Sequence, residues 1–253
     1  MADVAPALRT SLSDVFLGIV CPIANEGAAG LRFARAVLEQ CDGFRAVQFF
    51  AVLDKVSIDD TLKILEEATR DDPRLQVVWA PENTCIVDAY VRGYREALKA
   101  GADWILEIDA GYSHQPEDAP KLIAKMQEGY DCVFGSRFMP GGEIANSSFR
   151  RLVVSRGGGW LANLLLGTKM TDMTSGFEMF SRSTLEMVLR KGIHSRAHFF
   201  QTEIKAYCHG LHWAEVPIRY QFASPRLKAT AVTESFRQLW RLYQMQRAGE
   251  LTL

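Results

Sequence analysis

Cysteine is scarce in this sequence, and its spacing does not suit a metal-binding or disulfide-rich protein. The five cysteines are odd in number, none is spaced C-x-x-C, and each lies in a mostly apolar stretch. We therefore expect free thiols, no zinc ribbon and a cytoplasmic location. Long apolar runs are also missing, because residues 15–24 reach only about half the length of a membrane span. No apolar stretch precedes Val15, so we expect no signal peptide.

Net charge is almost absent: 29 Lys and Arg residues oppose 30 Asp and Glu residues. This balance excludes the global positive field that gathers nucleic acid phosphates, so we expect no nucleic acid partner. The stretch 219–247 is locally basic, with one acid, Glu234. Its cations are Arg219, Arg226, Lys228, Arg237, Arg241 and Arg247. The stretch predicts either peripheral contact with an anionic membrane or a diphosphate, or a solvated outer helix.

A Gly-rich dinucleotide-binding loop is absent as well. The first apolar run leads into the segment Pro22-Ile23-Ala24-Asn25-Glu26, without a G-x-G-x-x-G pattern. This absence excludes a nicotinamide-dependent dehydrogenase built on a doubly wound sheet.

Short apolar runs alternate with amphipathic stretches through the first half of the chain. This alternation predicts an α/β fold with a mostly parallel central sheet flanked by helices. The expected strands are 15–21, 47–53, 75–79, 104–108 and 131–134, and the expected helices are 31–38, 61–69, 87–98 and 119–126. A β-like segment at 213–222 and an amphipathic stretch at 233–247 follow in the second half. No linker or repeat is evident, so we expect one domain.

Polar residues follow the expected strands at the edge where such sheets bind ligands. They include Glu26, Asp54, Asp109 and Arg137. Carboxylates there can hold a divalent cation, accept hydrogen bonds from a ribose or act as a general base. We assign Asp54 to ligand binding, and Asp59 and Asp60 to capping of the next helix.

Several other motifs admit two interpretations. Glu107 either assists Asp109 or is structural, and Gly135-Ser136-Arg137 suits either an anionic ligand or an ordinary turn. The cluster 157–159 is expected to let a helix pack closely rather than to cradle phosphate. Asp172 precedes a Gly turn, and Glu203 is either a functional acid or a first-turn helix charge.

In order along the chain, these segments resemble glycosyltransferase family 2 of the GT-A fold, and most closely its dolichyl-phosphate mannose synthase-like branch. The resemblance covers roughly 18–222. The matching segments are PIANE, DKVSIDDT, DAGYSHQPE, GSRFMPGG, SRGGGWLANLLLG, DMTSGFEMF, FFQTE and EVPIRY. It implies one GT-A glycosyltransferase domain over 1–253. Residues 14–137 would be the nucleotide-sugar half, 138–232 the acceptor half, and 233–253 an amphipathic helix and tail.

The resemblance also implies the chemistry. The chain would be an inverting hexosyltransferase that moves a sugar from a nucleotide-diphosphate sugar to a polyprenyl phosphate or another small hydroxylated acceptor. It would contact the membrane peripherally or through a membrane-anchored partner. Donor-binding residues would be Pro22, Asn25, Glu26, Asp54, Asp109, Arg226 and Lys228. Asp172 would be the general base, with Arg137 and Glu203 shaping the sugar or acceptor pocket.

The cation site departs from the family pattern. The resemblance implies Mg²⁺ or Mn²⁺ near Asp109, but Gly111 stands where the family's D-x-D has its second carboxylate. Lys55 likewise replaces an acid of the family's D-D pair. Since Mg²⁺ often uses only one or two protein carboxylates together with phosphate oxygens, Asp109 can suffice. The alternative is a decayed nucleotide-sugar-binding or regulatory subunit.

Overall fold

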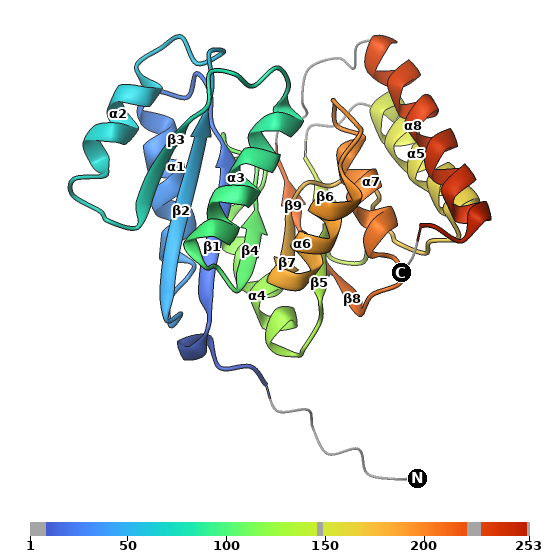
Figure 1. Ribbon diagram of the computed structural model, residues 1–253, viewed down its shortest axis with the longest axis horizontal. Helices are drawn as coiled ribbons and strands as arrows, with labels where there is room; N and C mark the ends of the chain where they lie inside the picture. Colours follow the sequence, from blue (N-terminus) through green and yellow to red (C-terminus); the bar gives the residue numbers. More distant parts are fainter. Residues whose placement is uncertain (1–8, 146–148, 222–228, 252–253) are drawn as a thin grey trace.

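The protein is built on a seven-stranded sheet with helices on both faces (Figure 1). The computed structural model describes residues 9–145, 149–221 and 229–251. The strands of this sheet lie in the order β3-β2-β1-β4-β7-β5-β8. Their bounds are β1 (Phe16–Pro22), β2 (Ala46–Leu53), β3 (Leu75–Trp79), β4 (Trp104–Glu107), β5 (Cys132–Ser136), β7 (Glu178–Ser181) and β8 (Trp213–Pro217). The α/β fold expected from the sequence is confirmed.

Eight α-helices connect and cover the strands of the described chain. They are α1 (Ala28–Glu39), α2 (Thr61–Ala68), α3 (Ile86–Ala100), α4 (Ala119–Gln127), α5 (Phe149–Leu166), α6 (Arg182–Lys191), α7 (Phe200–Cys208) and α8 (Ala229–Ala248). Short 3-10 turns, η1 (Leu12–Asp14) and η2 (Pro116–Asp118), precede β1 and α4. None of these helices combines the length and apolar character needed to cross a bilayer, within the described ranges.

β7 is the main departure from the expected topology. It lies between β4 and β5 and is antiparallel to both, whereas the other neighbours in the sheet are parallel. The strand escapes prediction because it is only four residues long and opens with a charged residue, Glu178. The sheet is therefore mixed at its centre, with a parallel β1–β2–β3 side.

The segment 213–222 is predicted as one β-like stretch and forms two strands in the structure. β8 joins the main sheet, and β9 (Arg219–Tyr220) pairs with β6 (Glu143–Ile144) in a separate two-stranded ribbon. Ile218 lies between them, buried. This ribbon brings Tyr220 beside His114 through an isolated bridge, so it closes over the end of β4.

The hydrophobic core lies on both faces of the sheet. Along β1, Val20 joins the cluster under α3, while Leu17 and Ile19 join the cluster under α1, α2 and α4. This alternation follows from the two-residue period of a strand. Helix α3 approaches β1 so closely that a Cβ at Gly93 would lie 2.3 Å from Val20 Cγ1. A glycine is therefore required at this crossing.

Of the two caps expected for α2, the one from Asp59 is confirmed and the one from Asp60 is not. Asp59 Oδ1 accepts hydrogen bonds from the Thr61 amide, at 3.1 Å, and the Thr61 hydroxyl, at 2.6 Å. Asp60 occupies the N-cap position but makes no side-chain cap bond. Thr61 Oγ1 in turn accepts from the backbone N–H groups of Glu26 and Gly27. The start of α2 thus fixes the loop that follows β1.

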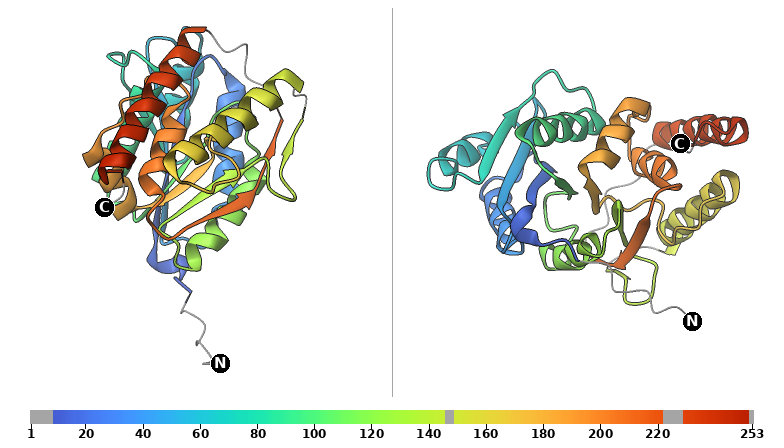
Figure 2. Two further views of the ribbon diagram at one scale, coloured as in Figure 1. Left: turned by 90° about the vertical axis from the view of Figure 1, so that its right-hand side faces the viewer. Right: turned by 60° about the horizontal axis from the view of Figure 1, so that its bottom comes forward.

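Helices α5 and α8 pack side by side at one end of the molecule, away from α2 and β3 (Figures 1 and 2). The glycines 157–159 lie within α5, as expected, but the predicted close packing is wrong for two of them. A Cβ at Gly157 or Gly158 would meet nothing within 4 Å, and one at Gly159 would only touch Met173.

Candidate functional site

The loops after β1 and β2 form one side of the candidate site. Asn25 has a left-handed backbone, with φ of 59°, and its amide bridges to the neighbouring loop. Its Nδ2 donates to the Val56 carbonyl at 2.8 Å, and its Oδ1 accepts from the Ile58 amide at 3.0 Å. Asn25 therefore fastens two loops together, through one hydrogen bond at each polar atom of its side chain. Its expected part in donor binding stays a prediction.

Three expected donor-site residues lie together at this edge: Pro22 ends β1, Glu26 follows in its loop, and Asp54 follows β2. One oxygen of Asp54 accepts from the Val56 amide at 2.9 Å, which holds the turn. Glu26 is fixed through its backbone by Thr61, while its carboxylate has no hydrogen-bond or ion-pair partner among the described residues. Burial and then the nearby Asp59 raise the pKa of Glu26 above its usual value.

Asp109 follows β4 and is 43% exposed in its side chain. The Tyr90 hydroxyl, on α3, donates to Asp109 Oδ1. Its other oxygen lies 3.7 Å from His114 Nδ1, and the Asp109 amide donates to the same nitrogen at 3.4 Å. Asp109 is thus held through both its side chain and its backbone and is still open to solvent, as a ligand of a cation should be.

His114 is a site residue that sequence reasoning missed. Its ring is buried between Phe177 and Tyr220, with centroid distances of 5.3 and 5.2 Å. Burial lowers the pKa of His114 to about 4, so the ring is neutral at pH 7 and Nδ1 can accept the Asp109 amide. The signal available in the sequence was its place between Asp109 and the Pro116 helix start.

Gly111 marks the departure from the family's D-x-D pattern, and Glu26 lies against it. Its φ is +79°, and a Cβ placed there would lie 3.0 Å from Glu26 Oε1. A glutamate carboxylate therefore occupies the space that a side chain at position 111 would enter. Two carboxylates, Asp109 and Glu26, border this point.

Arg137 and Asp172 form a buried bidentate ion pair at the end of β5. Arg137 Nε lies 2.7 Å from one carboxylate oxygen and Nη2 lies 2.9 Å from the other. Thr174 also donates to Asp172 through its amide and hydroxyl. Burial would raise the pKa of Asp172, but Arg137 outweighs it and lowers the pKa to about 2. These contacts do not fit the expected general base, because both oxygens are engaged and bind a proton weakly.

The guanidinium of Arg137 is also enclosed by aromatic rings. Its carbon lies 5.3 Å from the Phe138 ring centre and 5.4 Å from that of Tyr220. Within the described part of the chain, Nη1 is the guanidinium nitrogen without a hydrogen-bond partner. Burial lowers the pKa of Arg137, but Asp172 outweighs burial and raises it, with a smaller contribution from Asp109. A fixed cation thus faces the carboxylate side of the site.

Glu203 is placed away from this rim, contrary to expectation. It is fully buried on α7 and accepts the backbone amides of His194 and Ser195, at 3.1 and 2.9 Å. The Tyr207 hydroxyl and the Arg241 guanidinium, on α8, also donate to it. Because four donors already occupy the Glu203 oxygens, neither oxygen is free to bind a ligand. Glu203 instead joins α7, α8 and the 194–195 turn. Its partner Arg241 is correspondingly not a solvated surface cation.

Glu107 does not assist Asp109 at the rim. Glu107 is fully buried below Asp109, where Tyr94 and Gln201 each donate to one of the Glu107 carboxylate oxygens. Burial and then Glu178, its partner across β4 and β7, raise the pKa of Glu107. Glu178 pairs in turn with buried Lys205, a pairing between distant residues that no sequence spacing reveals. The structural alternative for Glu107 therefore holds.

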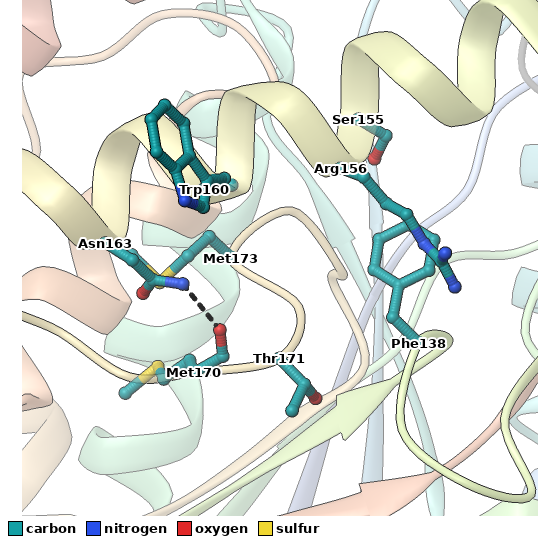
Figure 3. A pocket seen from close by; sticks show the side chains of 9 residues that line it. Phe138, Ser155, Arg156, Trp160, Asn163, Met170, Thr171 and Met173 are labelled. Carbon is teal, nitrogen blue, oxygen red and sulfur yellow. Dashed lines mark hydrogen bonds between the residues drawn. The ribbon is translucent and has the colours of Figure 1, made fainter.

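A cavity of about 370 Å³ lies under α5 (Figure 3), and its lining includes Phe138, Thr171 and Met173, the chain neighbours of Arg137 and Asp172. It is lined by Phe138, Ser155, Arg156, Gly159, Trp160, Asn163, Met170, Thr171 and Met173. Arg156 lies 5.0 Å from the Phe138 ring, so guanidinium groups flank that ring from two elements. Asn163 donates to the Met170 carbonyl and ties the cavity wall to α5. The lining thus mixes apolar side chains with the polar side chains of Ser155, Arg156, Asn163 and Thr171.

Helices α5 and α8 also present large apolar side chains to solvent. Val153, Trp160 and Leu164 on α5 are 51, 67 and 63% exposed, and Phe236 and Trp240 on α8 are 59 and 57% exposed. We call these five residues the α5/α8 apolar patch. Arg237 and Arg247 are exposed on the same helix α8. The expected phosphate-binding residues Arg226 and Lys228 lie outside the described residues.

Protein side chains supply only some of the ligands that a divalent cation would need at this site. No group of three or more His, Cys, Asp or Glu side chains is placed to hold a metal within the ranges described. Mg²⁺ and Mn²⁺ accept oxygen ligands, and Mg²⁺ is commonly held by one or two carboxylates with the remainder from phosphates and water. Asp109, with Glu26 beside Gly111, meets that lesser requirement.

Comparison with known proteins identifies related sequences. The family model described as glycosyl transferase family 2 matches residues 19–189. The polyprenol monophosphomannose synthase of Mycolicibacterium smegmatis is 32% identical over 67% of this chain and 65% of its own length. The undecaprenyl-phosphate mannosyltransferase of Micrococcus luteus is 32% identical over 67% of this chain and 70% of its own length. The match thus spans slightly less than two thirds of the first relative.

Solved structures share the fold at low sequence identity. Glucosyl-3-phosphoglycerate synthase from Mycobacterium tuberculosis, solved with Mn²⁺, UDP and glucosyl-3-phosphoglycerate, aligns with a TM-score of 0.65 at 18% identity. The alignment covers 92% of this chain and 80% of that one. A structure of the same enzyme with Mn²⁺, UDP-glucose and phosphoglyceric acid gives a TM-score of 0.66, also at 18% identity. These likenesses establish the GT-A architecture.

Proposed function

We propose that this chain, which belongs to glycosyl transferase family 2, transfers a sugar from a nucleoside-diphosphate sugar to a polyprenyl phosphate. The observation that carries the proposal is the family match over 19–189, because those residues include the whole rim from Glu26 to Asp172. The 32% identical relatives are named for polyprenol or undecaprenyl phosphate and for mannose, which favours a lipid phosphate acceptor and a hexose.

The reaction is a single displacement with inversion. A phosphate oxygen of the acceptor attacks the anomeric carbon of the sugar, and a new C–O bond forms. The bond from that carbon to the donor diphosphate breaks, and the nucleoside diphosphate departs with the electron pair. A phosphate acceptor is already ionised, so no side chain has to remove a proton. This suits a site in which Asp172 is held by Arg137.

The donor side of the rim would hold the nucleotide. Asp54, after β2, has one oxygen outside its turn and would accept hydrogen bonds from the ribose or base. Asp109 and Glu26 would hold a divalent cation at the diphosphate. When bound, that cation would neutralise charge on the departing diphosphate. Tyr90 holds the Asp109 carboxylate, and His114 accepts the Asp109 backbone amide.

The acceptor side would use Arg137 as its phosphate ligand. Asp172 orients the guanidinium, and Nη1 remains for a ligand. The neighbouring cavity under α5 would receive the phosphate end of the lipid and its first isoprenoid units, because its mixed lining offers apolar contacts from Phe138 and Trp160 together with the cation Arg156. The α5/α8 apolar patch and the exposed arginines of α8 would lie on an anionic membrane, from which the acceptor comes.

Transfer to a lipid acceptor provides the direct test. Purified protein would be incubated with Mn²⁺, undecaprenyl phosphate in phosphatidylglycerol vesicles, and labelled mannose or glucose as the uridine or guanosine diphosphate sugar. Label should move into the organic phase for one donor and should require the lipid phosphate. Label that moves only to a soluble acceptor such as phosphoglycerate would replace the lipid acceptor with a small molecule. Nucleotide binding without transfer to either would favour the regulatory alternative.

A further inference from the structure

We propose that Glu26 supplies the second carboxylate of the cation site, in place of the side chain that position 111 lacks. The inference rests on the proposed function and extends it by assigning a cation ligand from the loop after β1. The family pattern places both carboxylates of the D-x-D segment on the loop after β4. In this chain they come from two neighbouring strands of the sheet.

The first observation is the contact between Glu26 and Gly111. A Cβ at Gly111 would lie 3.0 Å from Glu26 Oε1 and 3.5 Å from both Cδ and Oε2. The approach is close enough that a side chain at position 111 and the Glu26 carboxylate would compete for one volume. A φ of +79° at Gly111 also disfavours a larger residue. Glycine therefore makes room for the glutamate.

The second observation is that the Glu26 backbone is fixed while its carboxylate remains uncommitted. Thr61 Oγ1 accepts from the Glu26 amide at 2.9 Å and from the Gly27 amide at 2.7 Å. Asp59 accepts the Thr61 hydroxyl, so Asp59 is occupied in supporting this loop. In the described chain the Glu26 carboxylate has neither a hydrogen bond nor an ion pair. Both of its oxygens are available as ligands.

The third observation is that Asp109 lies two residues before Gly111, on the loop that Glu26 approaches. The two loops follow β1 and β4, which are neighbours in the sheet. The Asp109 side chain is 43% exposed, and no cation of the described chain pairs with Glu26. A bound divalent cation with diphosphate oxygens would satisfy both groups.

Mn²⁺ binding measured by electron paramagnetic resonance tests the assignment without an activity readout. Free Mn²⁺ would be titrated against the wild type, Glu26→Gln and Asp109→Asn, with UDP or GDP present. Both substitutions should weaken Mn²⁺ binding roughly tenfold or more. Glu67→Gln is the matched control, because Glu67 is exposed on α2 and should leave binding unchanged. Thermal unfolding of each variant shows whether it is folded.

The outcomes separate the inference from the proposed function. Wild-type affinity in a folded Glu26→Gln variant, with loss in Asp109→Asn, would overturn the role of Glu26 alone. Absence of Mn²⁺ binding to the wild type with either nucleotide would overturn both proposals.

A relocated carboxylate gives a second, independent test. Glu26→Ala removes the crowding at position 111, so Glu26→Ala/Gly111→Asp should recover most of the Mn²⁺ affinity that Glu26→Ala loses. A folded double variant without recovery would show that the two side chains do not serve the same role. Gly111→Asp alone should reduce thermal stability, because the new side chain meets the Glu26 carboxylate.

Discussion

Arg137 and Asp172 illustrate how a partner changes what a residue can do. Asp172 precedes a Gly turn, and the family resemblance implies that it is the general base. In the fold, its oxygens accept from Arg137 and Thr174 and its pKa falls to about 2. The residue therefore acts as a positioning group for the guanidinium.

Asp172→Asn should destabilise the protein by about 3 to 5 kcal/mol at pH 7, because it leaves the buried Arg137 without a counter-charge. The folded-state pKa lies below the ordinary 3.8, so the carboxylate contributes stability above pH 3.8 and loses it as pH falls toward about 2. Urea unfolding from pH 7 to pH 3 should show the wild-type advantage shrinking. Asp60→Asn, at an exposed site, should show no such change.

The same variant distinguishes positioning from donor binding. Asp172→Asn should leave stabilisation by a nucleoside diphosphate near the wild-type value, about 2.7 kcal/mol at a hundredfold excess over Kd. Its rate of sugar transfer should fall, since Arg137 is no longer held toward the acceptor phosphate. An unchanged transfer rate in the folded variant would remove the pair from the site.

At the scale of elements, buried charges link α7 to the sheet. Lys205 donates to the Ser175 carbonyl at 2.6 Å and pairs with Glu178 on β7, and all these groups are excluded from solvent. Burial raises the pKa of Glu178 to about 7 even though Lys205 opposes the shift. The network fixes α7 against β7, the strand between β4 and β5.

Lys205→Met should therefore cost about 3 to 5 kcal/mol, because the Glu178 carboxylate would remain buried without its cation. Lys99→Met, at an exposed position of α3, should change the free energy of unfolding by less than about 0.5 kcal/mol. Urea unfolding at pH 7 measures both. Equal stability of the two variants would show that the pair is solvated.

Two helical glycines should respond in opposite directions to the same change. Gly93→Ala should destabilise by about 1 to 3 kcal/mol, since its Cβ would overlap Val20 at the α3–β1 crossing. Gly157→Ala should stabilise by up to about 1 kcal/mol, because α5 gains helix propensity and the Cβ meets nothing. Thermal unfolding would compare the pair, and equal shifts would contradict the close approach.

For the whole molecule, the sequence predicted the parallel β1–β2–β3 side well. Strong apolar runs end there in polar residues, so both the strands and the rim residues Glu26 and Asp54 are visible. The positions of Glu203 and Arg241 were not visible, because an ion pair between distant helices leaves no local pattern. The contact of Glu26 with Gly111 required the fold for the same reason.

The α5/α8 apolar patch would orient the molecule on a membrane. Trp160→Ala/Trp240→Ala should lower binding to phosphatidylglycerol vesicles by roughly tenfold for each indole lost, since each is more than half exposed. Co-sedimentation measures the bound fraction. Trp79→Ala, on β3 at the other end, is the control and should bind normally. Equal loss in the control would mean that the patch is not the contact.

The central place of β7 constrains how the chain acquires its structure during synthesis. β5 has only β7 and β8 as neighbours in the sheet, and both are translated after it. A nascent chain that ends before Glu178 can assemble β1 to β4, but it must leave β5 without a ladder. We therefore expect residues 14–137 not to fold by themselves and the sheet to be completed late, after β7 and β8 are synthesised.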